Sequence, residues 1–168
     1  YGIVAPEYGW DDYKNVDVRN KLVIVLSGEP SAPDKNDPSK LDPSVFKGDT
    51  RTYYSTREFK YDIAARKGAA AILVITDPEK SITYSLFQTF AKMEGFALKP
   101  RTPTPAFAMA GLITKNAARR LFAASGKDLD KLEESAGRKD FRPVPTNARA
   151  NISVKTKLRS VTSHNVIA

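Results

Sequence analysis

Apolar positions recur with two different periods in the stretch that organises this chain. Phe59 and Ile63 stand four residues apart and share one helix face, which contributes to a predicted helix over residues 55–67. Gly68 follows, and glycine adopts at little cost the left-handed conformation that ends a helix. An unbroken apolar run over residues 69–75 comes next. Because this run does not alternate with polar residues, we predict a strand that is covered on both faces.

The ends of this helix carry their own signals. Ser55 and Glu58 have the spacing of a capping box, so Ser55 is the expected N-cap. Arg66 and Lys67 fall in the last turn, where positive charge suits the helix dipole. The succession of helix, glycine and buried strand indicates an architecture and contains no chemistry by itself.

Further periodic segments lie on either side of this unit. The predicted strands are residues 2–5, 21–26, 106–109 and 152–158, and the predicted helices are residues 82–93, one capped by Thr114 and a short one starting at Asp128. The middle of this order is typical of strand–helix–strand crossovers. The last strand alternates apolar with basic residues, which predicts an antiparallel strand with one exposed face. We therefore predict a mixed α/β domain with part of its sheet open to solvent.

A long polar segment, residues 29–54, leads into the central helix. It is rich in proline, aspartate, serine and lysine, and a loop of this length in a compact domain is either functional or mobile. Tyrosine and arginine are favoured at contact sites. Tyr53, Tyr54 and Arg57 are therefore candidate contacts to a substrate or to another domain. The alternative is that they pack the base of the loop.

Composition narrows the class of protein. The chain has 168 residues, of which 41% are hydrophobic and 27% charged, as in one soluble globular domain. No apolar run approaches the roughly 20 residues of a membrane span. The absence of cysteine excludes disulfides, thiolate nucleophiles and cysteine metal sites. The apolar, strand-like ends suggest a segment of a longer protein, with residues 160–168 starting the connection to the remainder.

The net charge of +8 is unevenly distributed. Residues 1–98 hold 13 basic and 14 acidic residues, a balance of −1, whereas residues 99–168 hold 14 and 5, a balance of +9. One interpretation is a basic module that binds nucleic acid or an anionic surface. The other is a set of solvated faces, which is favoured because the charges are interspersed and lack interleaved aromatic residues.

Candidate catalytic groups are few. His164 is the only histidine, and adjacent carboxylates such as Asp11 and Asp12 more often cap a turn than work as an acid/base pair. The chain has neither a Gly-x-Ser-x-Gly elbow nor a Gly-x-Gly-x-x-Gly loop. We therefore predict no catalytic residue and no metal ligand, which argues against an enzyme.

Several motifs together resemble a protease-associated (PA) domain. The most specific is a lysine-containing helix that ends in Gly-Ala-Ala-Ala and an apolar strand, and the similarity runs over nearly the whole chain. The motifs lie at residues 20–26, 60–75, 105–109 and 121, with flanks at residues 1–13 and 163–168. The flanks are similar to those of the PA domain inside bacterial zinc aminopeptidases of the co-catalytic di-zinc type.

This resemblance implies a single PA domain over residues 1–168, with a β/β/α fold of two β layers and flanking helices. It implies a non-catalytic module beside a zinc exopeptidase, shaping substrate access or mediating protein interaction. The zinc ligands of such enzymes lie in the peptidase domain, so this segment is expected to hold no cofactor. The implied partners are the peptidase domain in cis, a peptide substrate or another protein, with no nucleic acid and no membrane span. The implied location of the parent is periplasmic or secreted.

Overall fold

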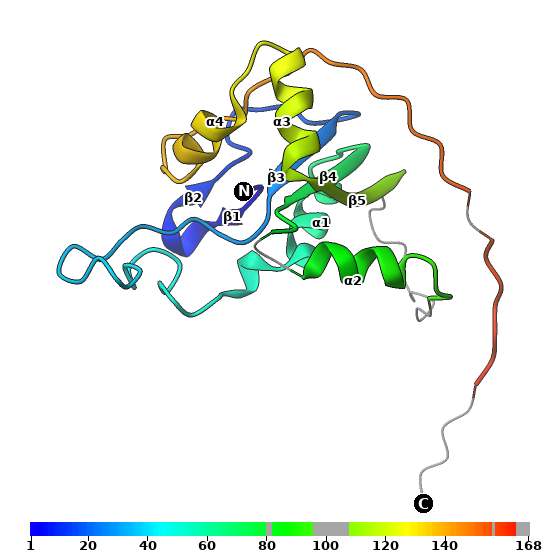
Figure 1. Cartoon of the computed structure of the whole chain (residues 1–168), viewed down its shortest axis with the longest axis horizontal. Helices are drawn as coiled ribbons and strands as arrows, with labels where there is room; N and C mark the ends of the chain where they lie inside the picture. Colours follow the sequence, from blue (N-terminus) through cyan, green and yellow to red (C-terminus); the bar gives the residue numbers. More distant parts are fainter. Residues whose placement is uncertain (80–81, 96–107, 156, 164–168) are drawn as a thin grey trace, which may run out of the picture.

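The computed structural model describes residues 1–79, 82–95, 108–155 and 157–163, and the part it describes is a mixed α/β arrangement with two sheets (Figure 1). None of the described helices has the length and apolar sequence needed to cross a bilayer. In chain order the helices and strands are β1 (Val4–Ala5), η1 (Pro6–Tyr8), β2 (Trp10–Asp11), β3 (Leu22–Leu26), η2 (Tyr53–Ser55), α1 (Arg57–Arg66), β4 (Ala71–Thr76), α2 (Thr83–Phe90), β5 (Met109–Thr114), α3 (Lys115–Ala124) and α4 (Leu129–Ala136).

The main sheet has three parallel strands in the order β3-β4-β5. Leu26 lies opposite Ile75, and Ile75 lies opposite Ile113. The central strand β4 is buried along nearly all its length, which confirms the prediction from its unbroken apolar run. Antiparallel pairing among named strands is confined to β1 and β2, which form a separate two-stranded sheet. The prediction of a strand at residues 2–5 is thus confirmed in β1, whereas β2 was not predicted.

Helices cover the two faces of the main sheet in pairs. On one face Ile72 packs in a cluster with Ala64 of α1, and α2 lies over the neighbouring part of that face. On the other face Ile75 packs with Phe122 of α3 and Leu129 of α4. Two consecutive crossovers between adjacent parallel strands put their helices on one face when both have the same hand, as observed for α1 and α2.

The N-cap of the central helix lies one residue later than its sequence predicts. The N-cap is Thr56, whose hydroxyl accepts a hydrogen bond from the Phe59 amide at 3.3 Å. The predicted capping box at Ser55 is wrong, because the Ser55 hydroxyl instead donates to the carbonyl of Thr52 at 2.7 Å and closes η2. Gly68 has φ +82°, which confirms the predicted left-handed stop.

The sequence analysis predicted the third strand of the sheet too early in the chain. Residues 106 and 107 of the predicted strand lie outside the described residues, and β5 runs over Met109–Thr114. Ala110 and Gly111 have low strand propensity, and pairing with β4 overrides it. The predicted cap at Thr114 is confirmed, since its hydroxyl accepts from the Ala117 amide at 3.2 Å.

The predicted strand at residues 152–158 is wrong. Residues 141–155 and 157–163 form neither helix nor strand, and from residue 147 onward every one of these residues is exposed. Figure 1 shows this part of the chain running away from the body of the molecule. Alternation provides an apolar face, but a strand also needs a neighbour for its backbone groups, and here the described structure supplies none.

Candidate interaction surface

The polar loop at residues 29–54 is anchored by one buried aromatic ring. Phe46 is 1% exposed and stacks on Tyr8 with the ring centroids 4.5 Å apart. Trp10 and Tyr54 meet the same ring edge-on at 5.5 and 6.0 Å. Such pairs stabilise beyond the area they bury. Sequence reasoning missed this anchor, although a lone phenylalanine in an otherwise polar loop was the available signal.

Tyr54, a predicted contact residue, is half-buried within this aromatic cluster. Its ring meets Phe59 edge-on at 4.8 Å, and its hydroxyl donates to the carboxylate of Glu7. That hydrogen bond raises the pKa of Tyr54 to about 12 and lowers the pKa of Glu7. Tyr54 therefore joins the start of α1 to the N-terminal hairpin, which is formed by β1, η1 and β2.

The other two predicted contact residues differ in their surroundings. Tyr53 is 65% exposed, and its ring meets Phe59 edge-on at 5.3 Å and Tyr54 in a tilted contact at 6.5 Å. Arg57 is half-buried, and its guanidinium carbon lies 5.8 Å from the centroid of the Phe87 ring. The structure thus leaves Tyr53 on the surface and uses Arg57 to connect α1 with α2.

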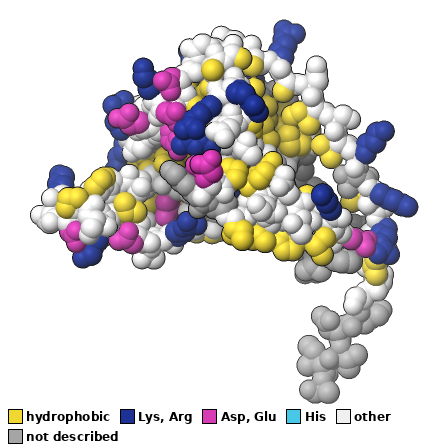
Figure 2. Space-filling model, viewed as in Figure 1, with side chains coloured by type: hydrophobic (Ala, Val, Ile, Leu, Met, Phe, Trp, Pro, Cys, Tyr) yellow, Lys and Arg dark blue, Asp and Glu magenta, His cyan; other side chains and the backbone are white. Residues whose placement is uncertain are grey.

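The outer side of α2 carries an exposed row of large apolar side chains. Ile82, Leu86, Phe90 and Met93 follow one another at intervals of four, four and three residues, and each is between 44% and 70% exposed. Figure 2 shows apolar side chains gathering along the lower side of the molecule, where α2 lies in Figure 1. We call these four residues the α2 ridge. A contiguous exposed apolar row is typical of an interaction surface.

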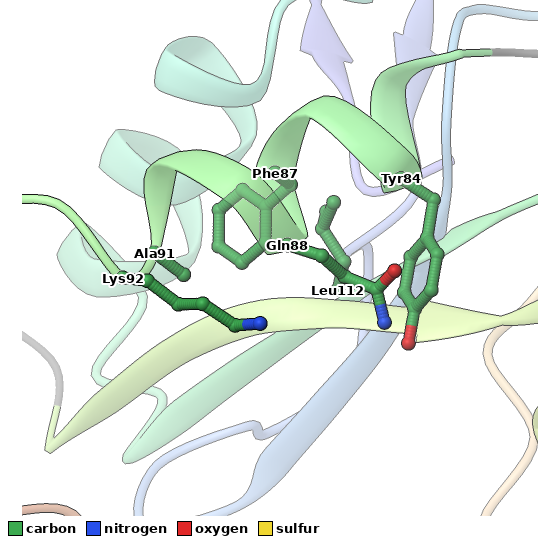
Figure 3. Close-up of a pocket in the computed structure, with 6 residues that line it drawn as sticks. All are labelled: Tyr84, Phe87, Gln88, Ala91, Lys92 and Leu112. Atoms are coloured by element: carbon green, nitrogen blue, oxygen red, sulfur yellow. The ribbon is translucent and has the colours of Figure 1, made fainter.

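The inner side of α2 does not close tightly over the sheet. A hollow of about 390 Å³ separates it from Leu112 of the edge strand β5. Tyr84, Phe87, Gln88 and Lys92 point from the helix toward this strand (Figure 3). The hollow is therefore lined by both apolar and polar groups and lies next to the edge of the sheet.

Two buried charged side chains, which sequence reasoning also missed, link the N-terminal segment to α1. Lys60 is fully buried, and its ammonium donates to the carbonyl oxygen of Tyr1 at 2.6 Å. Asp12 is 6% exposed and accepts from the Ile3 amide at 3.0 Å and from the Trp10 indole at 2.7 Å. Burial lowers the pKa of Lys60 to about 7. A neutral lysine is a nucleophile, but complete burial keeps this one from reaching a substrate, so its role is structural.

Of the two adjacent carboxylates, Asp11 takes the predicted turn-capping role, whereas Asp12 is buried. Asp11 accepts from the Tyr13 amide at 2.8 Å, while Asp12 organises the buried cluster. Within the described residues, no group of three or more histidine, aspartate or glutamate side chains is placed to hold a metal ion. His164 lies outside the described residues.

The basic excess of the C-terminal part is concentrated near its end. On α3 and α4 the charges pair, with Lys115 and Glu133 at 2.5 Å and Arg119 and Asp130 at 2.9 Å. Beyond residue 140 the sequence contains no acidic residue, and its cations are Arg142, Arg149, Lys155, Lys157 and Arg159.

Comparisons with protein-family models, with curated proteins and with solved structures gave no significant match to this chain.

Proposed function

We propose that this chain is a non-catalytic, PA-like contact module of a zinc aminopeptidase, acting through the α2 ridge and the exposed Tyr53. The proposal joins the sequence resemblance to one structural observation. Apart from Tyr53, the large exposed apolar side chains of the described residues are those of the α2 ridge and, near the C-terminus, Ile152, Val154, Leu158 and Val161. An apolar surface gathered in this way favours a protein or peptide partner over a small polar ligand.

The proposed partner is the peptidase domain of the same protein, with peptide substrates or a second protein as further candidates. In this role the ridge would border the entrance to a cleft and restrict the length of peptide that enters. Zinc and its ligands would belong to the peptidase domain, and the parent would be periplasmic or secreted. Arg57 supports the assignment of this face, because it ties the ridge-bearing helix to α1 through Phe87.

The test uses the full-length peptidase with Leu86→Ser and Phe90→Ser on the ridge. We expect unchanged turnover of a single-residue chromogenic substrate and an altered turnover ratio between short and long peptides. Arg120→Ser is the matched control, because Arg120 is exposed on α3 on the opposite face of the sheet. An unchanged ratio in the ridge variant would contradict gating. Zinc-dependent hydrolysis by residues 1–168 alone would contradict a non-catalytic module.

A second candidate function is binding to nucleic acid or another polyanion. It is favoured by the run of five cations without an acidic residue after residue 140. Such binding weakens steeply with salt, because it releases condensed counterions. Titration of a labelled oligonucleotide at two salt concentrations tests it, with Lys155→Ser and Lys157→Ser as the variant. Absent or salt-independent binding would remove this candidate.

A further inference from the structure

A second hollow, of about 350 Å³, lies between the N-terminal hairpin and the chain that follows α4. Its lining includes the apolar side chains of Val4 and Trp10 and three exposed cations, Lys14, Lys139 and Arg142. Figure 1 shows α4 next to the hairpin, so segments from the two ends of the chain meet here. We call this space the hairpin hollow. Its volume falls in the range of about 300 to 1,000 Å³ that is typical of small-molecule sites.

The three cations of the hairpin hollow have no carboxylate partner among the described residues. The side chains of Lys14 and Lys139 form no hydrogen bond or ion pair there. Arg142 donates through one guanidinium nitrogen to a backbone carbonyl at 2.6 Å, which leaves its other N–H groups available. The carboxylate nearest to them in sequence, Asp140, pairs instead with Arg138 at 3.5 Å.

The charge of the hairpin hollow favours an anion that carries more than one negative charge. Asp11 also lines the hollow, so three cations and one carboxylate give a formal balance of +2. Asp11 accepts from the Tyr13 amide at 2.8 Å, which holds its carboxylate in the turn. A phosphate monoester carries a charge of about −1.5 to −2 at pH 7, which matches this balance. A single carboxylate would leave part of it uncompensated.

The apolar part of the hollow indicates what such a phosphate is attached to. Trp10 is 3% exposed and donates its indole N–H to Asp12 at 2.7 Å, so its ring is held in place. Val4 belongs to the paired strand of the same hairpin. An aromatic wall beside unpaired cations suits an organic phosphate better than inorganic phosphate, because the attached group removes apolar surface from water.

We propose that the hairpin hollow binds a small organic phosphate monoester, with Lys14, Lys139 and Arg142 contacting the phosphate and the apolar residues contacting the attached group. Arg142 can present two parallel N–H groups to phosphate oxygens, and the lysines add point charges. Lys14 and Lys139 are not among the five cations of the polyanion-binding candidate, and no residue of the α2 ridge lines the hollow. The site is therefore independent of the proposed function.

Calorimetric titration of the unmodified chain with phenyl phosphate tests binding. We expect one saturable site, with weaker binding of inorganic phosphate, which lacks the ring, and of benzenesulfonate, which carries a single negative charge. Lys14→Gln and Lys139→Gln should each weaken the binding of phenyl phosphate by about fivefold, as expected for one exposed charge pair. Lys127→Gln is the matched control, because Lys127 is exposed and does not line the hollow. Absence of saturable binding, or an equal loss in the control variant, would overturn the proposal.

Nuclear magnetic resonance locates the bound phosphate. Trp10 is the only tryptophan, so its indole N–H gives a single signal. We expect this signal and the amides of residues 9–14 and 139–142 to shift when phenyl phosphate is added. Asp11→Asn should tighten binding, because it removes the opposing charge and keeps an oxygen that can accept from the Tyr13 amide. Shifts confined to other residues, or unchanged or weaker binding in Asp11→Asn, would overturn the proposal.

Discussion

Helices α1 and α2 cover the same face of one sheet, yet their outer sides are opposite in character. The outer side of α1 is charged, with Asp62 and Arg66 paired at 2.8 Å. The outer side of α2 is the exposed ridge that includes Leu86 and Phe90. Both helices follow a parallel strand, so their place in the topology does not explain the difference.

The buried residues of α1 stabilise the fold, whereas the exposed apolar residues of α2 are available for contact. α1 buries Phe59 and Ala64, and its charged outer side satisfies the usual requirement of a surface helix. α2 instead places apolar residues on its outer side, while its inner side carries both apolar and polar residues. An exposed apolar row of this kind is typical of an interaction surface.

The largest expected effect is a contrast between one aromatic residue on each helix. Phe59→Ala removes a ring that is 8% exposed and contacts both Tyr53 and Tyr54, so we expect a loss of about 3 to 5 kcal/mol in the free energy of unfolding. Phe90→Ala removes a ring that is 60% exposed and should cost less than about 1 kcal/mol. Urea unfolding of both variants measures the difference. Similar losses would mean that the ridge is part of the core.

The buried lysine of α1 should make stability depend on pH. Burial holds the pKa of Lys60 at about 7, below its unfolded value of 10.5. Between these two pKa values the unfolded chain therefore binds more protons than the folded chain. The free energy of unfolding rises with pH in this range, by up to about 1.4 kcal/mol per pH unit. Lys60→Met should flatten this rise.

The measurement is urea unfolding between about pH 8 and about pH 9.5. The lower limit lies above the pKa of Lys60 in the folded chain, and the upper limit lies below the ordinary pKa of tyrosine, which burial raises further for Tyr13. Lys67→Met is the matched control, because Lys67 is exposed one turn beyond Ala64. The same slope in Lys60→Met and in the unmodified chain would contradict the assignment.

A smaller effect is expected at the start of α1, which has a side-chain cap that α2 lacks. Thr56→Ala removes the hydroxyl that accepts from the Phe59 amide and should cost about 1 kcal/mol. Thr56→Ser keeps the acceptor and should cost much less. Thermal unfolding of the two variants distinguishes the cap from simple loss of a methyl group, and equal losses would argue against the cap.

The smallest expected effect is the coupling between the two helices. Arg57 lies over the Phe87 ring, a contact that contributes about 0.5 to 1 kcal/mol at an exposed site. A double-mutant cycle with Arg57→Met and Phe87→Leu isolates this term from the cost of each substitution. A coupling energy indistinguishable from zero would show that α1 and α2 are held together by the sheet alone.

The elements that sequence reasoning placed well are those with strong local signals. β3 and β4 are unbroken apolar runs, α3 has its threonine cap, and Gly68 stops α1 where expected. The mixed α/β class followed from this order of elements. Tyr53, Tyr54 and Arg57 were proposed as contact residues from residue type, which stays a prediction, and their different surroundings required the structure.

The sequence by itself determined where apolar strands and capped helices form, because these choices depend on residues within about four positions of each other. The tertiary structure decided which of those segments find a neighbour. Gly111 is part of a strand because it pairs with β4. The residues around Val154 have a clearer alternation of apolar and polar side chains, but they pair with no strand of the described structure. It also buried Lys60 and Phe46, since burial depends on residues that are distant along the chain.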